Sequence, residues 1–206
     1  MVRPPSPDRA DIMDRVADLV VVSGPPGAGK STVARLLSKM FAPSALVAGD
    51  DFFGFIDRGF VAPWTAEAHR QNEIVVEAAA ASAGRLAAGG YTVTYDGVIG
   101  PWFLERFGAA TGLARLHYVM LLPPQHVCVD RVGSRVGHGF TDLDATRHMY
   151  GDFAGASIDG RHVITGLGSA ELIATSIHER VLAGSFAWTV GEDSSQARDV
   201  PRHLGG

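Results

Sequence analysis

The sequence predicts an α/β fold in which helices cover both faces of a parallel sheet. Short apolar runs alternate with helical patterns along the chain, and most runs are followed by a turn and then a helix. This alternation is typical of units in which parallel strands are joined by crossover helices. The 206 residues suit one domain with a core that needs neither disulfides nor metals. We therefore expect a three-layer α/β/α sandwich around a five-stranded parallel sheet.

Five apolar runs predict the strands, and longer amphipathic patterns predict the helices. The strands are expected at Leu19–Ser23, Ala45–Gly49, Tyr91–Asp96, Leu116–Leu122 and Arg161–Thr165. The helices are expected at Lys30–Phe41, His69–Ala88, Pro101–Gly112, Gln125–Arg135, Asp142–Phe153 and Ser169–Ala183. Gly89-Gly90 ends the alanine-rich helix, since glycine takes the left-handed C′ conformation without steric cost. Ligands in such sheets bind at the carboxyl ends of the strands.

Composition and the chain ends narrow the class of protein. The net charge of −4 and a pI near 6.0 argue against a sequence-independent nucleic-acid binder. Cys128 is the single cysteine, which fits a reducing compartment, and its neighbours predict a small buried side chain. No apolar stretch is long enough to span a membrane, and the first residues lack the apolar middle of a secretory signal. We expect a cytoplasmic monomer or homodimer, with one domain over residues 16–190 and flexible tails at 1–15 and 191–206.

A glycine-rich stretch, GPPGAGKS, directly follows the first predicted strand. It fits the pattern G-x-x-x-x-G-K-[S/T] at Gly24, Gly29, Lys30 and Ser31. Glycines let successive N–H groups point at phosphate oxygens, and the helix that opens at Lys30 adds unpaired N–H groups and the positive end of its dipole. Lys30 would reach the β- and γ-phosphates of ATP, and the Ser31 hydroxyl would bind Mg²⁺.

The alternative for this stretch is a glycine-rich turn with no ligand. The buried strand before it and the amphipathic helix after it favour a nucleoside triphosphate site instead. The residues expected to line that site are Gly24, Pro25, Pro26, Gly27, Ala28, Gly29, Lys30, Ser31 and Thr32.

Acidic residues end the next two predicted strands. Asp50 and Asp51 close AGDD, and Asp96 closes TYD. A phosphoryl-transfer site needs one carboxylate to hold Mg²⁺ and another to orient or deprotonate the attacking hydroxyl. Asp-Asp and Asp-Gly are also ordinary turn sequences, but beside a phosphate loop they would converge on one cleft. We predict Asp51 as the catalytic base and Asp50 and Asp96, with Ser31, as the Mg²⁺ site; which of the three aspartates is the base stays open.

Arginines in residues 128–148 predict a lid over about 134–150. Arg131 and Arg135 are four residues apart and so share a helix face, and the glycine-spaced VGHGF that follows has the composition of a hinge before Arg147. Arginine planes stack on adenine and their forks grip phosphates, while closure excludes water from the reaction. The alternative is a solvated helix face with salt bridges to Asp130, Asp142 or Asp144.

With these motifs, residues 18–183 resemble the small P-loop kinases, a superfamily that includes adenylate, shikimate and gluconate kinases and chloramphenicol phosphotransferase. The resemblance implies a P-loop NTPase fold with strand order 2-3-1-4-5. VDRVGSR is similar to the lid of adenylate kinases, which implies that Arg131 packs on adenine and that Arg135 contacts phosphates during catalysis. LVAGDDFF is similar to the end of strand two in chloramphenicol phosphotransferase, which points to Asp51 as base. HVITGLG resembles the stretch near the adenine, so Gly166 and Leu167 are expected there.

Aromatic residues depart from the adenylate-kinase pattern, in which arginines after strands two and three bind the acceptor phosphate. They lie in an expected helical insert at about 52–70 and after strand three, at Phe52, Phe53, Phe55, Phe60, Trp64, Trp102 and Phe103. An aromatic-walled pocket suits an uncharged or partly apolar alcohol, although some of these rings are expected to be core. Arg58, Arg70 and Arg106 leave an anionic acceptor open. The predicted acceptor site comprises Asp51, Phe52, Phe53, Trp64, Asp96 and Trp102.

These observations predict an ATP- and Mg²⁺-dependent kinase, a phosphotransferase that acts on a hydroxyl of a small molecule. Lys30, Asp51 and Arg135 are its predicted catalytic residues. Antibiotic inactivation is the favoured role, and a metabolic kinase for a sugar or nucleoside is the nearest alternative. A P-loop ATPase switch acting with a protein partner is a rival from another class. A polynucleotide kinase is weaker, because the acidic net charge predicts no nucleic-acid partner, and no membrane partner is expected either.

Overall fold

The computed structural model describes residues 18–134 and 140–191. Its sheet contains five parallel strands in the order β2-β3-β1-β4-β5, which is the predicted order. The strands are β1 (Leu19–Ser23), β2 (Ser44–Ala48), β3 (Thr92–Asp96), β4 (Arg115–Leu121) and β5 (Val163–Ile164). A sixth strand, β6 (Ala187–Thr189), which the sequence did not predict, pairs antiparallel with the first residues of β4.

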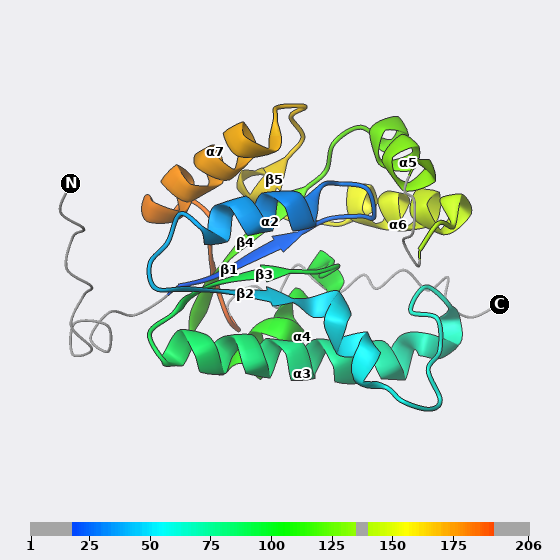
Figure 1. Cartoon of the computed structure of the whole chain (residues 1–206), viewed down its shortest axis with the longest axis horizontal. Coiled ribbons are helices and arrows are strands. Elements are labelled where there is room, and N and C mark those ends of the chain that lie inside the picture. The colour runs from blue at the N-terminus through cyan, green and yellow to red at the C-terminus, as the bar shows by residue number, and fades with distance from the viewer. Residues whose placement is uncertain (1–17, 135–139, 192–206) are drawn as a thin grey trace, which may run out of the picture.

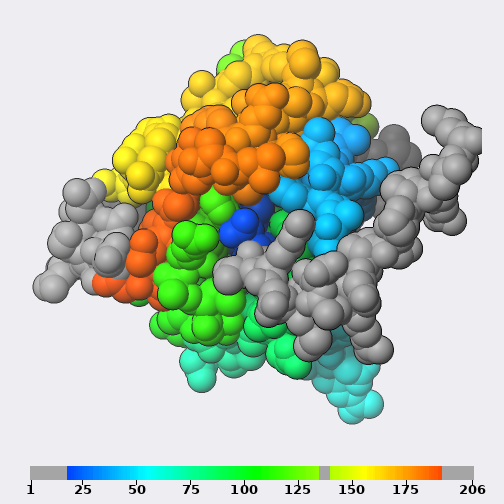
Figure 2. Space-filling view, turned by 90° about the vertical axis from the view of Figure 1, so that its left-hand side faces the viewer, coloured from blue at the N-terminus to red at the C-terminus, as the bar shows by residue number. Residues whose placement is uncertain are grey.

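Helices cover both faces of the sheet (Figure 1). The helices α3 (His69–Ala88) and α4 (Pro101–Thr111) pack together on one face, and α2 (Lys30–Ser38) and α7 (Ala170–Leu182) on the other. The carboxyl ends of the parallel strands point toward α5 (Gln125–Gly133), α6 (Leu143–Gly155) and the segment 49–68, which we call the insert segment. Figure 2 views the opposite end, where α7 lies beside α2.

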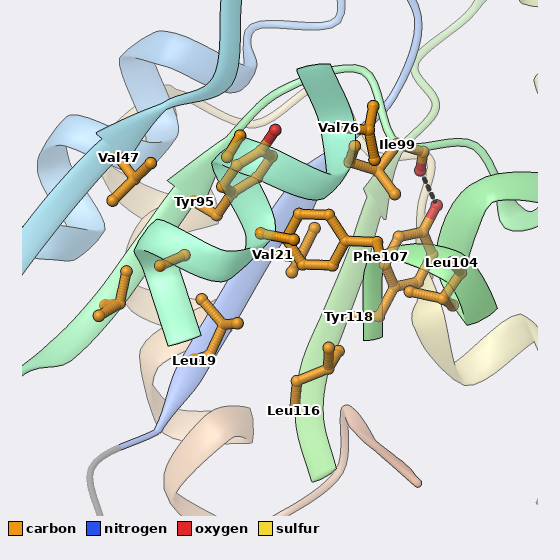
Figure 3. Close-up of a cluster of buried hydrophobic side chains, with 14 of the residues drawn as sticks. Leu19, Val21, Val47, Val76, Tyr95, Ile99, Leu104, Phe107, Leu116 and Tyr118 are labelled. Atoms are coloured by element: carbon orange, nitrogen blue, oxygen red, sulfur yellow. Dashed lines mark hydrogen bonds between the residues drawn. The ribbon is translucent and has the colours of Figure 1, made fainter. Parts of the chain in front are cut away.

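Alternate side chains of β1 point into two separate hydrophobic cores, one on each face of the sheet. Leu19 and Val21 point into the core under α3 and α4, whereas Val20 and Val22 point into the core under α2 and α7. Successive side chains of a strand face opposite sides of a sheet, so a strand buried on both faces reads as one continuous apolar run. Figure 3 shows the first core, in which the rings of Tyr95 and Phe107 meet edge to face at 4.7 Å.

The ends of the helices have identifiable causes. Gly90, with φ of 92°, follows the last turn of α3, as expected for a left-handed glycine at C′. The Asp142 carboxylate accepts hydrogen bonds from the N–H groups of Asp144 and Ala145 and so caps α6. Ser169 caps α7 through the N–H of Leu172. Among the helices that the structure describes, none combines the length and hydropathy needed to cross a membrane.

The insert segment, where a helical insert was expected at about 52–70, is helical only in part. It contains a 3₁₀ turn at Gly49–Phe55 and a second at Ala66–Ala68, and residues 56–65 between them are not helical. Gly54, Gly59 and Pro63 explain the difference, because glycine and proline disfavour a continuous helix. The non-helical part is fixed by side chains of α3: Gln71 bonds both the N–H and the carbonyl of Val61, and Asn72 donates to the carbonyl of Pro63.

Candidate active site

The loop from Gly24 to Gly29 joins β1 to α2 and adopts a backbone that requires glycine. Gly24, Gly27 and Gly29 have φ values of 138°, 81° and 95°. A Cβ on Gly24 would overlap the carbonyl oxygen of Leu121 in β4, and one on Gly27 would overlap the carbonyl oxygen of Cys128 in α5. The loop is therefore held against both elements, and these glycines are required by space as well as by φ.

The start of α2 presents a positive end to solvent. Gly29 occupies the N-cap in the left-handed conformation, and within the described residues no side chain caps the first turn and no acid lies in it. The N–H groups of the first turn and the helix dipole can therefore act on an anion. Lys30 is buried to 8% exposure, and its Nζ donates a 3.1 Å hydrogen bond to the carbonyl of Pro25, which folds the ammonium over the loop. The hydroxyl-bearing residues Ser31 and Thr32 are exposed.

Asp96 ends β3 beside this loop. It lies in register with Val22 of β1 and with Ala48 of β2, directly before the insert segment. Burial raises the pKa of the Asp96 carboxyl, and the nearby charge of Asp50 raises it further. A hydrogen bond with Ser31 and the charge of Lys30 act on the same pKa in the opposite direction.

The structure thus brings together four of the predicted residues, Lys30, Ser31, Asp50 and Asp96. Asp51 follows Asp50 in the 3₁₀ turn and is exposed to solvent. Within residues 18–134 and 140–191, no three side chains of His, Cys, Asp or Glu lie close enough together to hold a metal ion. The donors present, a hydroxyl and carboxylates beside a phosphate loop, suit Mg²⁺, which is usually held by one or two carboxylates together with substrate phosphates.

Two polar residues that the sequence did not single out fix the loop after β3. Ser23 donates a 2.6 Å hydrogen bond to the carbonyl of Ile99 and accepts one of 2.9 Å from its N–H. The Tyr118 hydroxyl donates to the same carbonyl at 2.7 Å (Figure 3). All three residues are buried, so these bonds fix Ile99 to the carboxyl end of β1 and to the middle of β4. Their partner is a main-chain group 76 residues away from Ser23, which no local pattern indicates.

Arg131 of α5 is anchored to the glycine loop. Its Nη1 donates to the carbonyl oxygens of Gly27 at 3.2 Å and Ala28 at 3.5 Å. A small pocket lies beside it, with walls from the loop, β4, α5, β5, α7 and the segment between β5 and α7: Ala28, Leu121, Pro123, Arg131, Ile164, Gly166, Gly168 and Ile173. Gly166 lies in this wall, whereas Leu167 is 63% exposed and does not line it; the expectation that both lie near adenine stays a prediction.

The predicted lid is described only in part. Arg135 and residues 136–139 lie outside the described residues, and α5 ends at Gly133. Arg147 of α6 pairs with Asp144 on the exposed helix face at 2.7 Å, which is one of the solvated pairings weighed for this segment. Cys128 is fully buried beside the loop, as its apolar neighbours predicted.

The predicted aromatic residues divide between the core and the protein surface. Phe52 and Phe103 pack against the core under α3 and α4. Trp64 is 43% exposed and Trp102 is 37% exposed. Phe55 is exposed and touches Phe52 edge to face at 5.3 Å. The exposed rings therefore lie on the insert segment and at the start of α4, on the side of the sheet opposite α2.

The fold is that of small P-loop kinases. The tunicamycin resistance protein of Deinococcus radiodurans is similar to this chain with a TM-score of 0.61 and 17% identity over 80% of this chain and 95% of its own. The APS kinase of Mycobacterium tuberculosis, in complex with AMPPNP and APS, gives 0.58 and 19% over 81% and 98%. A gluconokinase from Sinorhizobium meliloti gives 0.52 and 18% over 83% and 93%. No protein-family model matches the sequence, and no curated protein does.

Proposed function

We propose that this protein is an ATP- and Mg²⁺-dependent kinase that phosphorylates a hydroxyl group of a small molecule. One observation carries the proposal: the glycine loop with Lys30 lies beside Ser31, Asp50 and Asp96 at one edge of the sheet. Phosphoryl transfer is catalysed mainly by positioning and charge, and this edge supplies both. The proposed domain at 16–190 has a fold similar to those of the tunicamycin resistance protein and the APS kinase. These similarities cover 80% and 81% of this chain.

The glycine loop, the N–H groups of α2 and Lys30 would hold the triphosphate. Arg131 would lie against the adenine of ATP, next to the pocket that Ala28 and Gly166 line. Mg²⁺, held by Ser31 with Asp96 or Asp50, would neutralise charge on the phosphates. Two roles stay predictions: that Arg135 neutralises the charge that develops during phosphoryl transfer, and that Leu167 lies near the adenine.

In the reaction, a carboxylate takes the proton of the acceptor hydroxyl as its oxygen attacks the γ-phosphorus. The bond from that phosphorus to the β–γ bridging oxygen breaks, and ADP leaves with the electron pair. We assign the proton to Asp51, whose carboxylate is exposed in the 3₁₀ turn, so that Asp50 and Asp96 remain beside the metal. Asp50 is the alternative base.

Among acceptors we favour a hydroxyl-bearing antibiotic, in a cytoplasmic resistance enzyme. The similarity to a protein described as a tunicamycin resistance protein supports this choice, since both chains are covered over most of their length. The similarity to a gluconokinase supports a metabolic sugar kinase as the second choice. Fold alone does not decide between them, because this scaffold carries many acceptors.

The test is product formation by the purified protein. It would be incubated with ATP and Mg²⁺ and a panel of antibiotics, sugars and nucleosides, with products read by mass spectrometry. Asp51→Asn and Asp50→Asn would be compared with Asp57→Asn, a matched control, because Asp57 is fully exposed in the same segment. We expect the phosphorylated product to be abolished in Asp51→Asn, reduced in Asp50→Asn, which weakens the Mg²⁺ site, and unchanged in Asp57→Asn. Product lost only in Asp50→Asn would mean that Asp50 is the catalytic base. Formation of ADP without a phosphorylated product from any compound would mean that the protein is an ATPase and not a kinase.

A further inference from the structure

Two tryptophan–phenylalanine contacts connect the insert segment and α4 to residues in or just before α6. Trp64 of the insert segment meets Phe140, which precedes α6, with ring centroids 4.9 Å apart and an edge-on angle of 69°. Trp102, in the first turn of α4, meets Phe153 of α6 at 5.1 Å and 59°. The first contact thus joins the insert segment to the residues before α6, and the second joins α4 to α6 itself.

The two tryptophans retain apolar surface for a ligand. Phe153 is fully buried and so fixes the ring of Trp102, which also covers Gly100, where a Cβ would overlap the indole. Trp102 and Trp64 nevertheless remain 37% and 43% exposed. Large rings fixed on one face and open on the other are typical of sites that bind the apolar body of a small molecule.

The cations near these rings are already paired with carboxylates. Arg106 of α4 contacts Glu73 at 2.9 Å and Glu77 at 2.8 Å, both on α3. Arg70 and His69 contact the same Glu73 at 3.4 Å each. Glu73 is only 13% exposed, so this cluster is partly shielded from water and its cations are neutralised where they lie.

The surrounding segment is acidic as a whole. Residues 49–106 contain eight acidic side chains and four arginines, a formal charge of −4 that equals the net charge of the entire chain. Asp50 and Asp96 lie beside Lys30, where the proposed function places the phosphates. An anionic acceptor would therefore meet mostly like charge in this segment, because Arg70 and Arg106 are paired with Glu73 and Arg58 lies 3.9 Å from Asp57.

We propose that the acceptor is an alcohol without an anionic group, whose apolar body packs against the exposed rings of Trp64 and Trp102, and that anionic acceptors are disfavoured because Arg70 and Arg106 are already paired. This inference rests on the proposed function, since it concerns the acceptor of that same site. It makes Trp64 and Trp102 specificity-determining residues and gives Glu73 an indirect role, in which it occupies Arg106 and Arg70.

The test is the binding of two matched probes, methyl 3-phenyllactate and 3-phenyllactate, which share a ring and a hydroxyl and differ by one negative charge. Binding would be followed by tryptophan fluorescence in the presence of AMPPNP and Mg²⁺, so no turnover is needed. The chain has three tryptophans, and the third, Trp188, is buried in β6 as an internal reference. We expect the ester to bind at least about tenfold more tightly than the acid, because the acid carries like charge into an acidic site.

Two variants test the cause of the preference. Glu73→Gln releases Arg70 and weakens the hold on Arg106, so the acid should bind at least about threefold more tightly than to the unchanged protein. The matched control is Glu179→Gln on the exposed face of α7, which changes the net charge equally and should leave both probes unaffected. Trp64→Ala should weaken the ester severalfold, whereas Trp64→Phe should largely restore it.

The outcomes separate this inference from the proposed function. Equal or tighter binding of the acid, or no binding of the ester at millimolar concentration, overturns the inference even if AMPPNP binds. An increase in acid binding that is the same in Glu179→Gln overturns the role of Glu73. Failure of AMPPNP to bind to the unchanged protein counts against the proposed function itself, because the nucleotide site does not depend on the acceptor.

Discussion

The Nη1 of Arg131 donates a hydrogen bond to the carbonyl oxygen of Gly27 at 3.2 Å, which ties α5 to the glycine loop. Gly27 also lies close to the carbonyl of Cys128 in the same helix, where a Cβ would not fit. The guanidinium is therefore positioned before any nucleotide arrives. A side chain held in place in this way loses less conformational freedom on binding.

We expect Arg131→Ala to weaken ATP binding about tenfold, through loss of a planar, charged contact at the nucleotide. Arg131→Lys should recover only part of this loss, because an ammonium keeps the charge but neither stacks nor forks. Isothermal titration calorimetry with AMPPNP would measure both. Arg147→Ala is the control, since Arg147 is paired on the surface of α6, and an equal loss there would show that only net charge matters.

Lysine substitution gives an internal comparison, because the chain contains only Lys30 and Lys39. Lys30→Ala should reduce kcat/KM about 100-fold or more, as expected when a charge that acts on the transferred phosphoryl group is removed. Lys39→Ala, which removes an exposed cation at the end of α2, should leave kcat/KM within about twofold. Steady-state kinetics would measure both variants. Comparable losses in the two would contradict the role of Lys30.

Glycine substitutions should separate required glycines from permissive ones. Gly27→Ala is expected to destabilise the fold by about 2–3 kcal/mol, since a Cβ there overlaps a carbonyl oxygen and φ is positive. Gly151→Ala in α6 is expected to stabilise it by about 0.5–1 kcal/mol, because alanine favours helices and no atom lies within 4 Å of the new Cβ. Urea denaturation would measure both free energies of unfolding. A neutral Gly27→Ala would show that the loop is not held against α5.

The buried carboxyl of Asp96 predicts a pH dependence of stability. Its pKa is raised in the folded protein, chiefly by burial, so folding favours the protonated form. The corresponding stabilisation is complete below the ordinary aspartate pKa and is lost as pH rises through the higher folded value. We expect Asp96→Asn to remove this loss, so that the variant unfolds at a higher temperature than the unchanged protein at neutral pH.

Activity should move in the opposite direction in the same variant, because an amide cannot hold Mg²⁺ as a carboxylate does. Melting temperatures measured across pH 3–8, together with kinase assays at neutral pH, would test both statements. A variant that melts lower than the unchanged protein at neutral pH would mean that the bond with Ser31 outweighs the burial of the charge.

Most of the fold could be predicted from the sequence. The parallel strands β1 to β4 are long enough to read as apolar runs, and each was found within a residue or two of its predicted bounds. The strand β5 has only two residues instead of five, because the Asp159 carboxylate accepts from the N–H of Arg161 and turns residues 160–162 into 3₁₀ helix. The strand β6 has three residues, too few for an alternating pattern to show.

The candidate site could be predicted only where its residues are consecutive in the sequence and form a recognisable motif. The glycine loop and the adjacent aspartates are of this kind. The bonds from Ser23 and Tyr118 to Ile99 join main chain to side chain across different strands, so no spacing indicates them. The contacts of Trp64 with Phe140 and of Trp102 with Phe153 likewise join separate segments, and composition showed the rings without showing their partners.

The division of one edge of β4 has a consequence for behaviour at high concentration. Residues 120–121 of β4 pair with β5, and residues 115–117 pair with β6. The two short strands cover most of that edge of β4. The new outer edge therefore consists of β5, with two residues, and β6, with three. An unpaired strand this short is a poor template for a neighbouring molecule, so intermolecular strand addition on this side of the sheet is disfavoured.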